Sequence, residues 1–205
     1  MAKHWRFFAV RSSLKGPSVE ASALIALALA ILLFPIRWIG AWMLAVLVHE
    51  VCHYAAVRAC GGVVSGIRLG VSGAKMDIWG LGYWQEVICA LAGPLGGICL
   101  LAMVKWLPRT AICALVQSLF NLLPVYPLDG GRALRCVFHG IFPASVADRI
   151  WNILQKGCLI CLVGLGVYSF AFLRAGLIPL ALSIILAFRW FSVNRPCINA
   201  TYSLQ

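Results

Sequence analysis

The chain has 205 residues, of which 62% are hydrophobic and only 11% are Asp, Glu, Lys or Arg, and its mean hydropathy is +0.94. Soluble domains carry about 25% charged residues, so this composition excludes an ordinary soluble protein and indicates a polytopic membrane protein. The formal net charge of +11 would favour nucleic acid as a partner of a soluble protein. In a membrane protein, basic loops set the topology and contact anionic lipid, so we expect the lipid bilayer and no nucleic acid as a partner.

Apolar runs predict six transmembrane helices in a single all-α intramembrane domain over residues 1–205, with no soluble accessory domain. A β-branched, Gly-rich stretch at 63–79 interrupts them after the second run and alternates in part, which predicts a small membrane-associated β-hairpin; a polar loop is the alternative. Residues 132–150 predict a loop with a short helix. The predicted spans are residues 21–34, 38–59, 84–107, 110–123, 153–173 and 176–191.

Lys and Arg are unevenly distributed between the two sides of these spans. If the N-terminus is cytoplasmic, 13 of the 17 fall on the inside, and only Arg37, Lys105, Arg109 and Arg174 fall outside. Cytoplasmic loops carry an excess of Lys and Arg, so the bias predicts a multi-pass protein with both termini in the cytoplasm.

The second apolar run contains His49-Glu50-Val51-Cys52-His53, a His-Glu-x-x-His motif. Histidines four residues apart on a helix share one face at about 6 Å, which suits two ligands of one tetrahedral zinc ion. Glu50 can reach a water molecule on the metal without being a ligand itself. Such spacings also occur by chance, and a buried His is often a satisfied polar group. Ionisable side chains are costly in a membrane span, however, which favours a functional metal site.

A third ligand is expected from the break that follows the fourth span. His53 lies about six residues before the inner end of its span, or roughly 9 Å below the membrane surface, and His49 lies about 6 Å deeper. The fourth span also runs inward and ends in a Pro- and Gly-rich segment that contains Asp129, one of only six acidic residues. A carboxylate oxygen at that depth would complete a His-His-carboxylate site with an open fourth position. A helix cap or an ion pair with Arg132 is the alternative for Asp129.

Asn121 is a second polar residue of this break, eight residues before Asp129. Its amide could donate a hydrogen bond to a scissile carbonyl oxygen or position a substrate. Helix capping is the alternative.

These motifs together resemble the site-2 protease family of intramembrane zinc proteases. The resemblance is carried by His-Glu-x-x-His in the second span, by Gly93-Pro94 in the third, and by Asn-x-x-Pro-x-x-x-x-Asp-Gly from Asn121 to Gly130. The six-span layout and the run from Asn121 to Arg132 are similar to the sporulation branch, the stage IV sporulation protein FB type. Cys52 departs from the pattern, because family members often have Gly at that position.

The resemblance implies one Zn²⁺ per chain held by His49, His53 and Asp129, with Glu50 as the catalytic acid and base. It also implies an enzyme of a bacterial cell membrane that cleaves a membrane-associated protein near the cytoplasmic face, such as a transcription-factor precursor or an anti-sigma factor, under the control of inhibitory membrane partners. The alternative is a membrane protein that binds or transports a metal without catalysis, or a scaffold that retains a substrate uncut. Transporters usually show repeated halves, and none is visible here.

Overall fold

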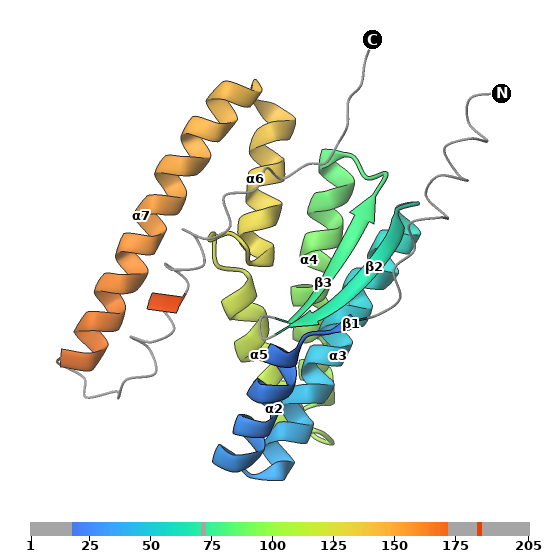
Figure 1. Ribbon diagram of the computed structural model, residues 1–205. Helices are drawn as coiled ribbons and strands as arrows, with labels where there is room; N and C mark the ends of the chain where they lie inside the picture. The colour runs from blue at the N-terminus through green and yellow to red at the C-terminus, as the bar shows by residue number, and fades with distance from the viewer. Residues whose placement is uncertain (1–17, 71–72, 172–183, 186–205) are drawn as a thin grey trace.

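The computed structural model describes residues 18–70, 73–171 and 184–185. The chain folds into a bundle of helices with a small sheet along one side (Figure 1). In chain order the elements are β1 (Ser18–Val19), α2 (Ala21–Leu33), α3 (Ile36–Ala59), β2 (Val63–Gly70), β3 (Gly73–Trp79), α4 (Tyr83–Cys99), the 3-10 helix η1 (Leu100–Met103), α5 (Pro108–Asn121), α6 (Asp129–Ile141) and α7 (Ala144–Ala171).

Three of the described helical segments are long and apolar enough to cross a membrane: Ile36–Ala59, Tyr83–Met103 and Ala144–Ala171. Large apolar side chains such as Leu47 on α3 and Ile160 on α7 are exposed, as expected of helices that face lipid. The first and fourth predicted spans form helices of 13 and 14 residues, which are shorter than the roughly 20 residues that a span requires. Nearly all of 176–191 lies outside the described residues, so the count of six spans stays a prediction.

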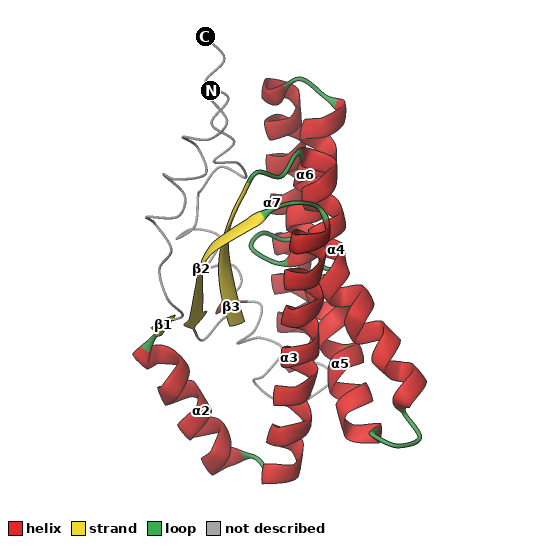
Figure 2. Cartoon of the chain, turned by 90° about the vertical axis from the view of Figure 1, so that its right-hand side faces the viewer, coloured by secondary structure: helices red, strands yellow, loops and turns green. Residues whose placement is uncertain are grey.

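The predicted hairpin is present as β2 and β3, which pair antiparallel from Val63–Trp79 to Gly70–Gly73. Inside the hairpin, Ser65 Oγ donates to the Asp77 carbonyl at 3.0 Å and accepts from the Trp79 indole at 3.1 Å. The two-residue strand β1 adds parallel to β2, so the sheet order is β1-β2-β3. The sheet lies beside the bundle rather than inside it (Figure 2). The predicted all-α class therefore holds for the bundle, with this three-stranded sheet attached.

Residues 132–150 differ from the prediction of a loop with a short helix. They form most of the 13-residue helix α6 and the start of α7, which begins at Ala144 rather than near residue 153. Polar side chains of this stretch make contacts between the helices. On α7, Asp148 Oδ1 lies 3.1 Å from His139 Nε2 and 3.5 Å from Arg135 Nη2, both on α6.

Small residues let α3, α4 and α5 pack closely. A Cβ added at Gly96 would overlap the Cys52 side chain on α3, and one at Gly97 would overlap Ser118 on α5. Buried alanines such as Ala45 continue these contacts. Small residues at helix interfaces in membranes allow this close approach.

The segment between α5 and α6 is irregular but packed. Val125 and Leu128 are buried against Leu159 of α7, and Gln155 of α7 donates to the Tyr126 carbonyl at 3.4 Å. Irregular backbone in a membrane protein is tolerated where protein covers it. This packing fixes the place where α6 begins, at Asp129.

Candidate metal centre

Helix α3 carries the two histidines on one face, as their four-residue spacing predicts. His49 is only 3% exposed, and the side chain of His53 is also largely buried. The ring of His53 lies against α4 where that helix has Gly93, and a Cβ at this position would overlap the imidazole. The absence of a side chain at Gly93 therefore leaves room for the imidazole of His53.

Asp129 reaches the histidines from the first turn of α6. Two glycines follow it, and the backbone of the preceding loop packs against them so closely that a Cβ at Gly130 would overlap Leu122, and one at Gly131 would overlap Val125. This tight turn brings the Asp129 carboxylate to α3 although 76 residues separate it from His53.

The three side chains converge on one point. His49 Nε2 lies 3.1 Å from Asp129 Oδ2, His53 Nε2 lies 3.2 Å from the same oxygen, and the two Nε2 atoms are 3.1 Å apart. The structure thus brings together the three residues predicted as metal ligands, and their ligand atoms form one compact group.

Hydrogen bonds of the two histidines indicate which ring nitrogens carry an unshared electron pair. These contacts surround the triangle formed by the ligand atoms of His49, His53 and Asp129. His53 Nδ1 donates to the Cys89 carbonyl at 2.7 Å, so a neutral His53 presents Nε2 as an unprotonated nitrogen. The Asn121 Nδ2 group lies 3.3 Å from His49 Nε2, which accepts from it. A neutral His49 then carries its proton on Nδ1, which is buried without a hydrogen-bond partner among the described residues.

The negative charge of Asp129 also suits a site that binds a cation. A free Asp carboxyl group has a pKa of about 4, so Asp129 carries a negative charge at neutral pH. The carboxylate is therefore an acceptor at neutral pH. Two imidazole nitrogens and a carboxylate oxygen then face one another within 3.2 Å, and three acceptors at such distances repel unless a cation lies among them.

These distances suit a small divalent ion. Zinc bonds of about 2.0–2.1 Å in a tetrahedral site place neighbouring ligand atoms about 3.3–3.4 Å apart, close to the observed 3.1–3.2 Å. Two imidazoles and one carboxylate are also a ligand set found in zinc enzymes, where a fourth position stays open. The residues present therefore fit a zinc ion, although other divalent metals accept the same ligands.

The two residues predicted to act in catalysis both lie next to the triangle. Glu50 follows His49 on α3 and is half-buried. Asn121 is the last residue of α5 and points its amide at His49 rather than capping its own helix. Their roles in a reaction stay predictions.

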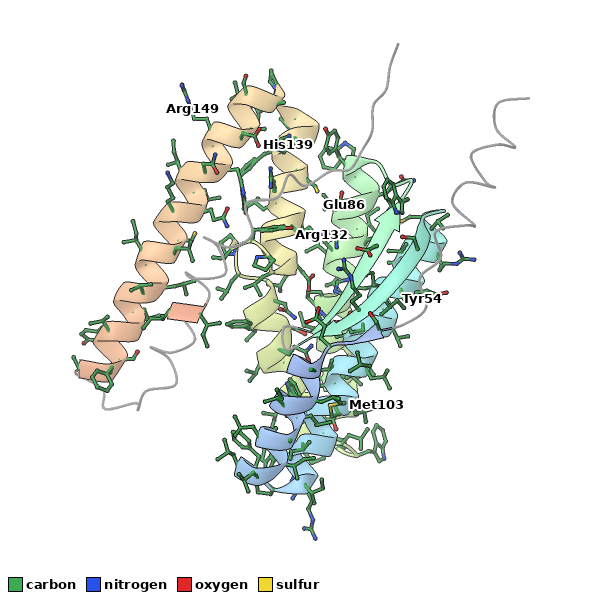
Figure 3. The ribbon with its side chains drawn as sticks, in the orientation of Figure 1. Tyr54, Glu86, Met103, Arg132, His139 and Arg149 are labelled. Carbon is green, nitrogen blue, oxygen red and sulfur yellow. The ribbon has the colours of Figure 1, made fainter. Side chains whose placement is uncertain are left out.

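The alternative considered for Asp129, an ion pair with Arg132, does not occur. Arg132 Nε instead donates to Glu86 Oε1 on α4 at 2.9 Å (Figure 3). The sequence reasoning missed Glu86, although an acidic residue inside a predicted span is itself a signal of a functional or paired site.

No family model and no curated protein sequence match the chain. Among solved structures, the chain is similar to the Site-2 Protease from Methanocaldococcus jannaschii, with a TM-score of 0.64 and 21% identity, over 87% of this chain and 90% of that one. The chain therefore shares the fold of a site-2 protease and holds, within that fold, three side chains that could bind a metal ion.

Proposed function

We propose that this chain is a zinc-dependent intramembrane metalloendopeptidase that hydrolyses a peptide bond of a membrane-associated protein. One observation carries the proposal. His49 and His53 lie with Glu50 on a helix long and apolar enough to span a membrane, and they converge with Asp129 of α6 to within 3.2 Å. The shared fold with a site-2 protease supports it.

Each side chain of the centre has a task in this reaction. A zinc ion held by the three ligands would polarise the scissile carbonyl and make water acidic enough to attack near neutral pH. Glu50 accepts the proton that water loses as it attacks the carbonyl carbon. It then returns the proton to the amine nitrogen that leaves when the C–N bond breaks. Glu50 is not one of the three residues whose ligand atoms converge, so its proposed task is proton transfer and not metal binding.

Asn121 is placed to orient both the site and the substrate. Its amide touches His49, so it lies at the edge of the ligand triangle. With the lone pair of His49 Nε2 taken by the metal, the NH₂ group can instead donate to the oxygen of the scissile carbonyl, where negative charge develops.

The hairpin offers a means of presenting the substrate. Helical peptide bonds are hidden, so a membrane segment must be extended before it can be cut. Among the described strands, β3 pairs on one side only, with β2, and an extended segment can add to its other edge through backbone hydrogen bonds. The alternative role of the hairpin is that of a lid over the site.

The biological setting follows from the resemblance and the charge bias. We propose a multi-pass protein of a bacterial cell membrane with cytoplasmic termini, acting in regulated intramembrane proteolysis. Its substrate is a transcription-factor precursor or an anti-sigma factor, inhibitory membrane partners control it, and sporulation is the proposed process.

The experiment is co-expression with candidate single-span anti-sigma factors and transcription-factor precursors, comparing wild type with Glu50→Gln. This substitution keeps the shape of the side chain but removes its ability to carry the proton. We expect normal expression, one zinc ion per chain, and loss of cleavage by at least about 100-fold. Unchanged cleavage by Glu50→Gln would reject the enzyme.

A further inference from the structure

The ion pair of Glu86 and Arg132 lies beside the metal centre and has no role in the proposed reaction. Arg132 follows Asp129 by three residues on α6, so the two side chains are neighbours on one helix face. A guanidinium and a carboxylate one turn apart form an ion pair readily. The structure shows no such pair, because Arg132 turns to Glu86 on α4 instead.

The Glu86 carboxylate is well placed to hold that guanidinium. Its side chain is 12% exposed and accepts from Arg132 Nε at 2.9 Å. Burial disfavours the charge of Arg132, yet the adjacent Glu86 raises the pKa of its guanidinium, so the cation persists. A half-buried arginine that lost this carboxylate would be drawn to another anion, and Asp129 is the one within electrostatic range on its own helix.

We infer that Glu86 is a positioning residue of the metal centre, which holds Arg132 away from Asp129 and so leaves the Asp129 carboxylate free to bind the metal. The inference rests on the proposed metal site. It also explains why Arg132, one helical turn from Asp129, does not compete with the metal for the Asp129 carboxylate. The same pair joins α6, which carries Asp129, to α4, which carries the Cys89 carbonyl that orients His53.

The test measures the zinc affinity of the purified full chain by chelator competition. Glu86→Gln should weaken zinc binding about 10- to 100-fold, the usual effect of losing a partner that orients a metal ligand. Arg132→Gln removes the competing cation and should stay within about threefold of wild type. The decisive variant is Glu86→Gln combined with Arg132→Gln, in which affinity should return to within about threefold of wild type.

The matched control is Asp148→Asn. Asp148 contacts Arg135 and His139, so the substitution removes polar contacts of the same helix α6 but leaves Glu86 and Arg132 paired. It should change zinc affinity by less than about twofold. If Glu86→Gln does not fold, Glu86→Asp replaces it, and Arg132→Gln must again reverse the loss.

Two results would overturn the inference: a Glu86→Gln protein that binds zinc as tightly as wild type, or a double variant no better than Glu86→Gln alone. Equal losses in Glu86→Gln and Asp148→Asn would also overturn it, because they would indicate a general loosening of α6. Zinc affinity is measured without substrate, so these results do not depend on protease activity. A failure of the proposed function would be seen in a different experiment, as cleavage that is unchanged in Glu50→Gln.

Discussion

Gly93→Ala should damage the metal centre while changing only one methyl group. A Cβ at residue 93 would lie 2.6 Å from His53 Cε1 and 2.7 Å from Cδ2, and closer still to Nε2. Ordinary van der Waals contact begins near 3.4 Å, so clearing Cε1 alone takes about 0.8 Å and clearing the closer Nε2 takes more. Metal sites tolerate ligand displacements of only about 0.2 Å.

The expected result is therefore a loss of zinc affinity of about 100-fold, comparable with the cost of a 1 Å misplacement in a catalytic site. The assay is chelator competition on purified protein, with bound zinc measured by mass spectrometry. Gly40→Ala on α3 and Gly157→Ala on α7 are matched controls, because a Cβ at either position meets no atom within 4 Å. The reasoning is refuted if Gly93→Ala binds zinc as tightly as these controls.

Three further predictions concern the ligands and the packing around them. His49→Ala or Asp129→Ala should reduce bound zinc well below one per chain, and a full zinc ion surviving both changes would reject the ligand assignment. Gly131→Ala should lower the stability of the folded protein by about 1–3 kcal/mol, seen as a lower Tm in detergent, because the new Cβ meets backbone that cannot move aside. Cys52→Ala should leave zinc stoichiometry unchanged, since the thiol packs against Gly96 and is not one of the converging ligands; loss of zinc would make Cys52 part of the site.

The parts of the fold that the sequence predicted are those with a strong local pattern. Alternation in 63–79 predicted the hairpin, and a largely apolar run predicted α3, which ends at Ala59 as expected. The convergence of Asp129 with the histidines was also predictable. A carboxylate in an irregular segment within the membrane is costly unless it binds a metal or pairs with another group.

Other parts depend on tertiary contacts that leave no local pattern. Residues 132–150 were predicted as a loop with a short helix, but Arg135 and His139 contact Asp148 on the next helix, and helices form instead. β1 has only two residues and is defined by its pairing with β2. The partner of Arg132 could have been Asp129 or a distant acid, and only the packing of α4 against α6 selects Glu86.

The most direct test of the central claim is hydrolysis in water enriched in ¹⁸O. Purified protein is reconstituted in liposomes with a substrate found by co-expression, and the products are weighed by mass spectrometry. The account predicts one solvent oxygen in the new carboxyl terminus with wild type, and no product with Glu50→Gln or after zinc is removed. Cleavage that persists in Glu50→Gln, or that survives removal of the metal, would contradict it.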